Sequence, residues 1–490
     1  MTPEPLVEQV RDLLSRVIDS HPGVPAVESL HDALAALDQP LVIAIAGKVK
    51  AGKSTLLNAL IGEELAPTDA SECTKLVTWY QDGVTYRVTL FARDGASEAV
   101  PYHRDAGALE VDLGAHTVDD VDRLVVEWPS ASLRTATLVD TPGLGSLTAE
   151  VSARTERFFG RDAERPATAD AVLYLMRHLH SDDVDFLEAF RDEIGVASPA
   201  NAIAVLSRAD ELSAGRLDGM EAAAQIADRY RRDPKVRRLC QTVVPVAGLV
   251  AQAGVTMTED KYRALARLAE AAAPDVDALV LSVDRFAYAE STVDITREER
   301  AALLAALGLF GVRLALTLVR DGTVCTATEL ARELVARSGI VELREVLAAG
   351  LTARRDVLKA RSGLRALQTA LRDPALAGDA DAAFELERIV AGAHEFAEIS
   401  LLDACRTGAA PFRENELDEV ERLLGASGTS VRERLGLPVD ARADEVQDAL
   451  RDVAGKWRTR AESPLSSREL VDAAQVLVRT CEGLATAPAV

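Results

Sequence analysis

Hydrophobic residues change their spacing along the chain. From Leu6 to Val17 apolar side chains recur at every third or fourth position, and a second pattern of this kind follows from Val24 to Leu37, which predicts amphipathic helices. Short apolar runs bounded by proline or glycine come next, and these are typical of strands buried in a parallel sheet. The runs lie at 41–46, 135–139, 171–175, 202–206 and 243–246.

Helical patterns separate these runs, so residues 40–250 are predicted to form β/α units around a mostly parallel sheet. Two further runs, 76–80 and 84–91, flank Asp82-Gly83 and predict a hairpin. A short helix is expected near 118–124.

Beyond residue 258 the strand patterns stop and helical periodicity takes over. Because the N-terminal helices have no other helical partner nearby in sequence, we expect them to pack on the C-terminal helices in one bundle. Helices are predicted at 262–272, 297–318, 326–336, 343–371, 383–405, 417–424, 444–460 and 468–485.

One helix is apolar enough to be compared with a membrane span. Residues 301–319 are apolar except for Arg313, and only twelve uncharged residues precede that arginine. A bilayer span needs about 20, so we expect a buried helix of a soluble protein. The first residues lack the basic and apolar stretches of a signal peptide.

Composition narrows the class of protein. The 490 residues exceed one ordinary domain, and 48% hydrophobic residues suffice for large cores. The net charge of −23 argues against a nucleic-acid partner and against broad adhesion to anionic lipid. The five cysteines lie far apart and predict no disulfide framework, which is typical of the cytosol.

A G-x-x-x-x-G-K-S motif follows the first predicted strand and starts a helix, which is the context of a phosphate-binding loop. In such a loop the backbone N–H groups surround phosphate, Lys53 reaches the outer phosphates, and Ser54 ligates Mg²⁺. A glycine-rich turn without a ligand is the alternative. The motif residues are Gly47, Lys48, Val49, Lys50, Ala51, Gly52, Lys53 and Ser54, and Thr55 follows them.

The strand at 135–139 ends in Asp140-Thr141-Pro142-Gly143. Asp140 is suited to hold the Mg²⁺ shell, and the N–H of Gly143 to sense a γ-phosphate. An ATPase motor more often has an acidic residue directly after this aspartate, so Thr141 favours a GTPase. A rival interpretation is a P-loop ATPase of the deviant Walker type, because Lys48 follows Gly47.

Guanine recognition is assigned to Ser207-Arg208-Ala209-Asp210, which replaces the usual N/T-K-x-D pattern. Asp210 can accept both donors of the guanine edge, and Arg208 can stack on the base. A helix N-cap is the alternative for this aspartate. The segment 244–248 is similar to a last base-contacting loop, with the backbone of Ala247 facing the guanine oxygen.

Thr74 is the candidate switch threonine that completes the Mg²⁺ shell, with Thr68 and Thr78 as rivals.

Together these motifs resemble those of bacterial dynamin-like proteins. The segments AGKVKAGKSTLLNAL, APTDASECTKLVTW, VDTPG, SRADELSAGR, VVPVAGL and ARSGIVELREVL carry the resemblance. It implies an α/β fold, with a P-loop GTPase domain at 39–355 and an all-α stalk bundle built from 1–38 and 356–490. It also implies GTP or GDP with Mg²⁺ as ligands, dimerisation through GTPase faces, and membrane remodelling.

The sequence departs from eukaryotic dynamins, which commonly carry Gln-Ser where this chain has Val49-Lys50. Valine cannot orient a water, and Leu144 replaces the glutamine of Ras-like enzymes. Lys50 is the candidate for transition-state charge in cis or across a dimer; a solvated loop lysine is the alternative. Slow or partner-dependent turnover is therefore expected.

The membrane contact implied by the family has little support in the sequence. The basic run 229–238 is more typical of a solvated helix face than of a lipid patch. We therefore expect a cytoplasmic GTPase whose membrane contact is at most peripheral, at the inner face of the plasma membrane. The alternative is a GTP-dependent scaffold with vestigial hydrolysis that docks a related dynamin-like partner. A ribosome-assembly GTPase is disfavoured, because no basic RNA-binding region follows.

Overall fold

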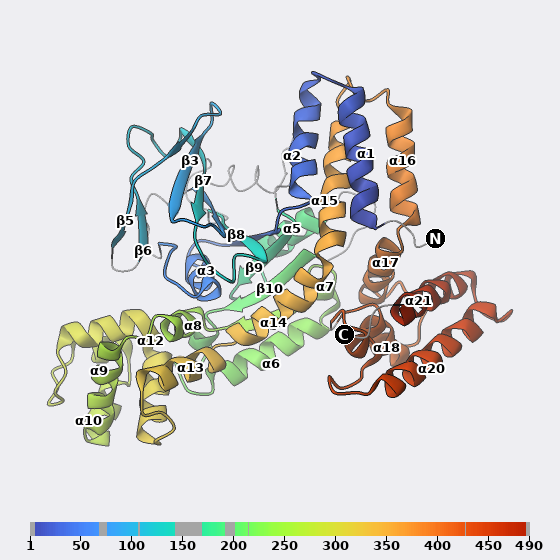
Figure 1. Cartoon of the computed structure of the whole chain (residues 1–490). Helices are drawn as coiled ribbons and strands as arrows, with labels where there is room; N and C mark the ends of the chain where they lie inside the picture. The colour runs from blue at the N-terminus through green and yellow to red at the C-terminus, as the bar shows by residue number, and fades with distance from the viewer. Residues whose placement is uncertain are drawn as a thin grey trace.

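A computed structural model describes residues 5–67, 76–105, 108–142, 169–191, 201–213, 215–426 and 428–486. A central mixed sheet is flanked by helices, a helical subdomain (residues 259–337) extends from one side of it, and two groups of helices lie on the other (Figure 1).

The sheet consists of a parallel part and an added edge, in the order β11-β10-β9-β1-β8-β2-β7-β3-β4. The strands β11, β10, β9, β1 and β8 run parallel, and every residue of β9, β10 and β11 is buried. The strands are β1 (Leu41–Gly47), β2 (Val77–Gln81), β3 (Arg87–Ala92), β4 (Ser97–Ala99), β7 (Val121–Glu127), β8 (Ala136–Asp140), β9 (Ala171–Met176), β10 (Ala202–Ser207) and β11 (Val243–Val246), and β5 (Tyr102–Asp105) and β6 (Ala108–Val111) form a separate pair.

All five predicted parallel strands are confirmed, but the predicted hairpin is wrong. Strand β7 lies between β2 and β3, parallel to the first and antiparallel to the second. Residues 82–86 therefore span two inter-strand spacings, roughly 10 Å. The helix expected near 118–124 is also wrong, because that segment enters β7. Its Val125 and Val126 suit a strand that is paired along both edges.

The helices of this region cover the sheet and build the helical subdomain. The apolar core of the subdomain is formed by α9 to α13 together with the neighbouring helix α8. The helices are α3 (Lys53–Ile61), α5 (Ser181–Arg191), α6 (Gly219–Arg232), α7 (Pro234–Arg237), α8 (Gly248–Val255), α9 (Glu259–Glu270), α10 (Ala273–Leu279), α11 (Val283–Tyr288), α12 (Arg297–Arg320), α13 (Ala327–Arg337) and α14 (Ile340–Gly350).

Among the described residues, α12 is the one helix long and apolar enough to cross a membrane, and half of its most apolar stretch is buried. It packs in the subdomain core against α8, α9 and α11, and it kinks at Gly308. Arg313, which interrupts the apolar run, donates to the carbonyl oxygen of Gly215 at 2.6 Å and to that of Val280 at 2.6 Å. The one charge within the apolar stretch 301–319 therefore binds two neighbouring segments.

Both chain ends contribute to the helical region, as predicted, but they build two cores instead of one bundle. The first core joins α1 (Leu6–Ser20) and α2 (Glu28–Ala36) to α15 (Arg355–Ala370) and α16 (Ala380–Gly392). The second core surrounds the buried Trp457. It is formed by α17 (His394–Thr407), α18 (Glu414–Leu423), α19 (Val431–Leu435), α20 (Ala443–Glu462) and α21 (Arg468–Thr486).

Two predicted helices are broken. The long helix expected at 343–371 is interrupted at Thr352–Arg354, between α14 and α15, and the one at 383–405 is interrupted at Ala393. Helix α17 then contributes Phe396 to the first core and Leu402 to the second. Periodicity alone misses both breaks, because apolar positions continue through them.

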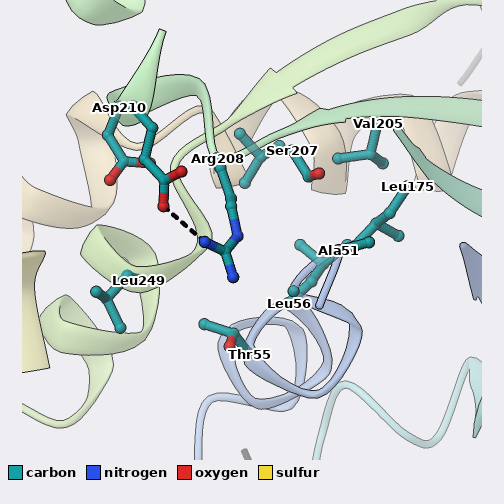
Figure 2. A pocket seen from close by; sticks show the side chains of 13 residues that line it. Ala51, Thr55, Leu56, Leu175, Val205, Ser207, Arg208, Asp210 and Leu249 are labelled. Carbon is teal, nitrogen blue, oxygen red and sulfur yellow. Dashed lines mark hydrogen bonds and ion pairs between the residues drawn. The ribbon is translucent and has the colours of Figure 1, made fainter. Parts of the chain in front are cut away.

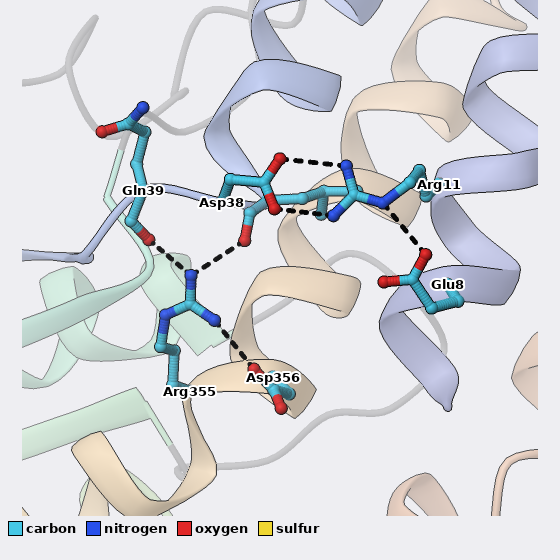
Figure 3. A network of polar contacts seen from close by, with 7 residues as sticks. Glu8, Arg11, Asp38, Gln39, Arg355 and Asp356 are labelled. Carbon is cyan, nitrogen blue, oxygen red and sulfur yellow. Dashed lines mark hydrogen bonds and ion pairs between the residues drawn. The ribbon is translucent and has the colours of Figure 1, made fainter. Parts of the chain in front are cut away.

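The break after α14 is where the sheet and both helical groups meet. The guanidinium of Arg355 donates to the carbonyl oxygens of Leu37 and Gln39, each at 3.0 Å, directly before β1 (Figure 3). Its neighbour Arg354 donates to the carbonyl oxygens of Leu424 at 3.1 Å and Gly425 at 2.6 Å, at the end of α18. Consecutive arginines thus bind the two helical groups to the same turn.

A buried ion pair fixes α15 to the sheet. Asp170, directly before β9, accepts from Lys359 Nζ at 2.7 Å, from Ser362 Oγ at 2.8 Å and from the backbone N–H of Val42 at 2.8 Å. The lysine side chain is 1% exposed and the aspartate side chain 6%. One carboxylate therefore joins β1, β9 and α15.

The basic run 229–238 is used inside the molecule. Arg231 donates to the carbonyl oxygen of Val243 at 2.8 Å and pairs with Glu342 at 2.6 Å. Arg237 pairs with Glu421 of α18, and Arg238 donates to the carbonyl oxygen of Thr407 at the end of α17. Part of this run therefore docks the second helical group on the sheet, instead of forming the fully solvated face that the sequence indicated.

We predict that Asp170→Ala strongly destabilises the protein. Removing one partner leaves the Lys359 ammonium buried without its counter-charge, which costs about 3–5 kcal/mol. Chemical unfolding followed by tryptophan fluorescence measures the loss. Asp448→Ala is the matched control, because Asp448 pairs with Arg451 on an exposed surface, and such a pair is worth at most about 1 kcal/mol. Equal stability of the two variants would contradict the prediction.

A second prediction concerns acid stability through Glu398 of α17. Burial alone would raise the pKa of this carboxyl, but hydrogen bonds from His394 and Thr480 and the charge of Arg434 lower it from 4.5 to about 2. Its stabilising effect is therefore complete above about pH 4.5 and is lost as the pH falls towards about 2.

Glu398→Gln is expected to lower stability at neutral pH, by about 3 kcal/mol from that pKa difference. Its stability should also depend less on pH below 4.5 than that of the unsubstituted protein. Unfolding curves taken at several pH values test this. If both proteins lost stability to the same extent below pH 4.5, Glu398 would be ruled out as the titrating group.

Candidate functional site

The phosphate-loop motif lies between the carboxyl end of β1 and the start of α3, as predicted. Gly47 and Gly52 have φ values of 149° and 94°, which favour glycine. A Cβ atom on Gly47 would also lie 2.6 Å from the carbonyl oxygen of Leu175 on β9. Only glycine therefore allows the loop to leave the sheet at this point.

Lys53, the first residue of α3, folds back over the loop. Its Nζ donates to the carbonyl oxygens of Gly47 at 3.3 Å and Lys48 at 3.5 Å. Burial lowers the pKa of this ammonium, while the charge of Asp140 acts against that effect. The ammonium thus lies where the loop N–H groups and the N-terminus of α3 favour an anion.

Asp140, the last residue of β8, lies beside the same loop and accepts a hydrogen bond from Ser54 Oγ at 2.8 Å. Its other oxygen, Oδ1, is buried and has no hydrogen-bond partner in the described part of the chain. Burial raises the pKa of this carboxyl, opposed by Lys53 and Ser54. A serine hydroxyl and a carboxylate with an unsatisfied oxygen form a donor set that fits Mg²⁺.

Some predicted residues cannot be compared with the structure. Thr74, Thr68 and Gly143 lie outside the described residues, as does Leu144. The rival Thr78 is described: it is buried in β2, where it pairs with Asp140 across the antiparallel ladder. A residue held in the ladder cannot move as a switch segment does, so the structure argues against Thr78.

Three further loop residues point in different directions. Lys48 Nζ lies 3.6 Å from the buried Oδ1 of Asp183 on α5, which also accepts from the hydroxyl of Tyr174 at 2.6 Å. Lys50 is exposed and has a φ of 62°. Val49 is 51% exposed. The loop therefore presents a cation and an apolar side chain to its surroundings.

A cavity of about 150 Å³ opens on the other side of the loop. It lies between α3, the ends of β9 and β10, and the start of α8, and Figure 2 shows Arg208 reaching towards Thr55 within it. The lining residues are Ala51, Gly52, Thr55, Leu56, Leu175, Val205, Ser207, Arg208, Asp210, Glu211, Val246, Gly248 and Leu249.

Asp210 lines this cavity from the turn Ala209–Glu211 and is only 7% exposed. Burial raises the pKa of its carboxyl, and the charges of Arg208 and Arg177 lower it in part. A Cβ atom on Gly308 would lie 3.8 Å from Asp210 Oδ2, so the kink of α12 passes directly behind this carboxylate. The apolar helix therefore forms part of the support of the site.

Ala247 is not among the residues that line the cavity, contrary to our expectation. Its N–H donates to the carbonyl oxygen of Ser338 at 2.9 Å, so this donor is already used. The next residues, Gly248 and Leu249, line the cavity instead. They lie in the first turn of α8, where backbone N–H groups have no partner within the helix. The residues that line the cavity therefore lie one or two positions after the residue that the sequence predicted.

Sequence reasoning also missed Glu211, Leu249 and Asp183. Glu211 directly follows Asp210, so its position alone could have indicated it. The other two had no signal, since tertiary packing brings them to the loop.

Comparison with known proteins agrees with this geometry. The sequence profile of the dynamin family matches residues 43–182, which include the phosphate loop and Asp140. The chain is 37% identical over 486 residues to the isoniazid-induced protein IniC of Mycobacterium tuberculosis, covering 97% of this chain and 98% of that protein. The chain belongs to the bacterial dynamin-like proteins, close to IniC.

Other relatives share a smaller part of the chain. The bacterial dynamin-like protein of Nostoc punctiforme is 34% identical over 145 residues, 27% of this chain and 20% of that protein. A solved oligomerised bacterial dynamin pair covers 98% of this chain and 75% of that chain, at 14% identity and a TM-score of 0.30. That score is too low to transfer the arrangement of domains to this dynamin-like protein.

Proposed function

We propose that this dynamin-like protein binds Mg²⁺·GTP, hydrolyses it slowly, and couples hydrolysis to dimerisation and membrane remodelling at the inner face of the plasma membrane. The observation that carries the proposal is that one edge of the sheet brings together Lys53, the Ser54–Asp140 pair and the Asp210 cavity. The proposed GTPase domain is 39–355, with 1–38 and 356–490 as the stalk.

Different residues of the loop are assigned to the phosphates and to the metal ion. Lys53 and the loop N–H groups bind the phosphate oxygens, and Ala51, Gly52 and Thr55 shape the path from the loop to the base cavity. Ser54 and Asp140, together with Thr74, would hold Mg²⁺, which when bound neutralises phosphate charge. Gly143 is proposed to respond to the γ-phosphate.

Recognition of the base is assigned to the cavity. Asp210, buried on the wall, accepts the two donors of the guanine edge, and Arg208 lies against the base. The first turn of α8, at Gly248 and Leu249, offers N–H groups for the guanine oxygen. Adenine lacks this pair of donors, so the cavity favours GTP over ATP.

Slow turnover follows from the side chains of the loop. Val49 has no group that can orient a water. Lys48 lies beside Asp183, so Lys50 is our candidate for additional positive charge at the transition state. Because Lys50 is exposed, it can also act on the nucleotide of a second copy facing this edge.

Val49 equally favours a second candidate, a GTP-dependent scaffold with vestigial hydrolysis that docks a related dynamin-like partner. The net charge of −23 and the internal use of the basic run both argue that the isolated protein binds anionic lipid weakly. The two candidates are separated by measuring the rate of GTP hydrolysis for the protein alone, with liposomes and with a second dynamin-like chain. Only an active GTPase should hydrolyse GTP faster when liposomes or the second chain are added.

We predict that Lys53→Ala abolishes GTP binding, because the ammonium contacts phosphate in every nucleotide state. Calorimetry with GTP and Mg²⁺ measures the loss, and Lys235→Ala on the surface of α7 serves as a control with the same charge change. Normal GTP affinity of the Lys53 variant would overturn the proposed phosphate site.

Base selection is tested with Asp210→Asn. The carboxylate only accepts, whereas the asparagine amide can donate to the xanthine oxygen that replaces the guanine amine. We expect GTP affinity to fall at least about a hundredfold and the preference to move towards xanthosine triphosphate. Titration of GTP and of xanthosine triphosphate into the unsubstituted protein and the Asp210→Asn variant measures this preference. Unchanged preference would place base recognition elsewhere.

A further inference from the structure

Arg208 has an unusual backbone and a fixed side chain. It directly follows β10, with a φ of 52° in the left-handed region that residues other than glycine rarely adopt. Its guanidinium donates to Glu211 Oε1 at 2.8 Å. Both side chains line the cavity that contains Asp210.

Glu211 holds a second arginine with its other oxygen. Oε2 accepts from Arg177 at 2.5 Å, and Arg177 directly follows the last residue of β9. One carboxylate thus bridges arginines at the carboxyl ends of two neighbouring strands. We call Arg177, Glu211 and Arg208 the clamp.

The clamp is too exposed to contribute much to folding. Its side chains are between 37% and 50% exposed, and ion pairs of this kind are worth at most about 1 kcal/mol. Two of its members, Glu211 and Arg208, line the cavity, which distinguishes the clamp from other surface ion pairs. A guanidinium that is already held in one place loses less conformational freedom when a ring packs on it, which favours binding.

We propose that Glu211 and Arg177 are positioning residues that hold the Arg208 guanidinium against the base of the bound nucleotide. This inference rests on the proposed GTP site. Stacking on a ring face does not distinguish one purine from another, whereas Asp210 reads the guanine edge. The clamp therefore sets affinity, and Asp210 sets base preference.

The test is a double-mutant cycle on the full chain. Glu211→Gln keeps the shape but removes the charge that holds both arginines, and we expect the affinity for GTP and for GDP to fall by about the same factor, roughly threefold to fivefold. KM for GTP should rise while kcat stays unchanged, because the phosphates are untouched. Preference for GTP over xanthosine triphosphate should not move.

The double-mutant cycle shows whether Glu211 affects GTP affinity through Arg208 or independently of it. In an Arg208→Ala background, which by itself should lose roughly tenfold in affinity, Glu211→Gln should have no further effect. Arg177→Met should change affinity in the same direction as Glu211→Gln and should not add to it. Glu333→Gln is the matched control, since Glu333 pairs with Arg337 at 2.9 Å on α13, and no residue of α13 lines the cavity.

Two results would overturn the clamp. One is unchanged GTP affinity in Glu211→Gln; the other is an equal loss with and without Arg208. Absence of GTP binding by the unsubstituted protein would instead overturn the proposed function and the clamp with it. Thermal unfolding of each variant confirms that it is folded.

Discussion

Asp170 connects three parts of the molecule that lie far apart in sequence. Its carboxylate accepts from the backbone of β1, from Lys359 and from Ser362, so the start of the central strand and the long helix α15 share one buried charge. A charge in such a place is tolerated only when all its partners are present. The position of the first helical group relative to the sheet therefore depends on this contact.

The same strand β1 links that contact to the phosphate loop. Its first residues lie next to Asp170 and close to Arg355, the first residue of α15, and its last residue is Gly47 of the phosphate loop. On the other side of the loop, α3 is contacted by α14, whose Arg344 donates to the carbonyl oxygen of Ala59 at 2.7 Å. Strand β1 on one side, and α3 with α14 on the other, thus connect the phosphate loop to the region around Thr352–Arg354.

Arginine holds these units together in an acidic chain. Arg237, Arg238, Arg313, Arg354 and Arg355 bind carbonyl oxygens or carboxylates between segments remote in sequence. A planar guanidinium with five donors satisfies several carbonyl groups at loop and helix ends, which a lysine does less well. The high arginine content thus has a structural use here, in addition to its place in the clamp.

The sequence alone determined the parallel strands, the phosphate loop, its position between β1 and α3, and the pairing of Ser54 with Asp140 in one site. These features depend on local patterns: buried strands read as apolar runs, and a glycine-rich loop needs specific residues at fixed spacing. It also indicated that both chain ends join in the helical region, because their apolar faces needed cover.

Only the tertiary structure decided what depends on contacts between distant segments. Strand β7 enters between β2 and β3 because both of its edges find partners there, which no turn signal at 82–83 reveals. The carbonyl oxygen of Ser338 accepts from the N–H of Ala247, and the kink of α12 at Gly308 lies next to the carboxylate of Asp210. Pairing and burial of this kind are properties of neighbours in space, so one-dimensional periodicity cannot specify them.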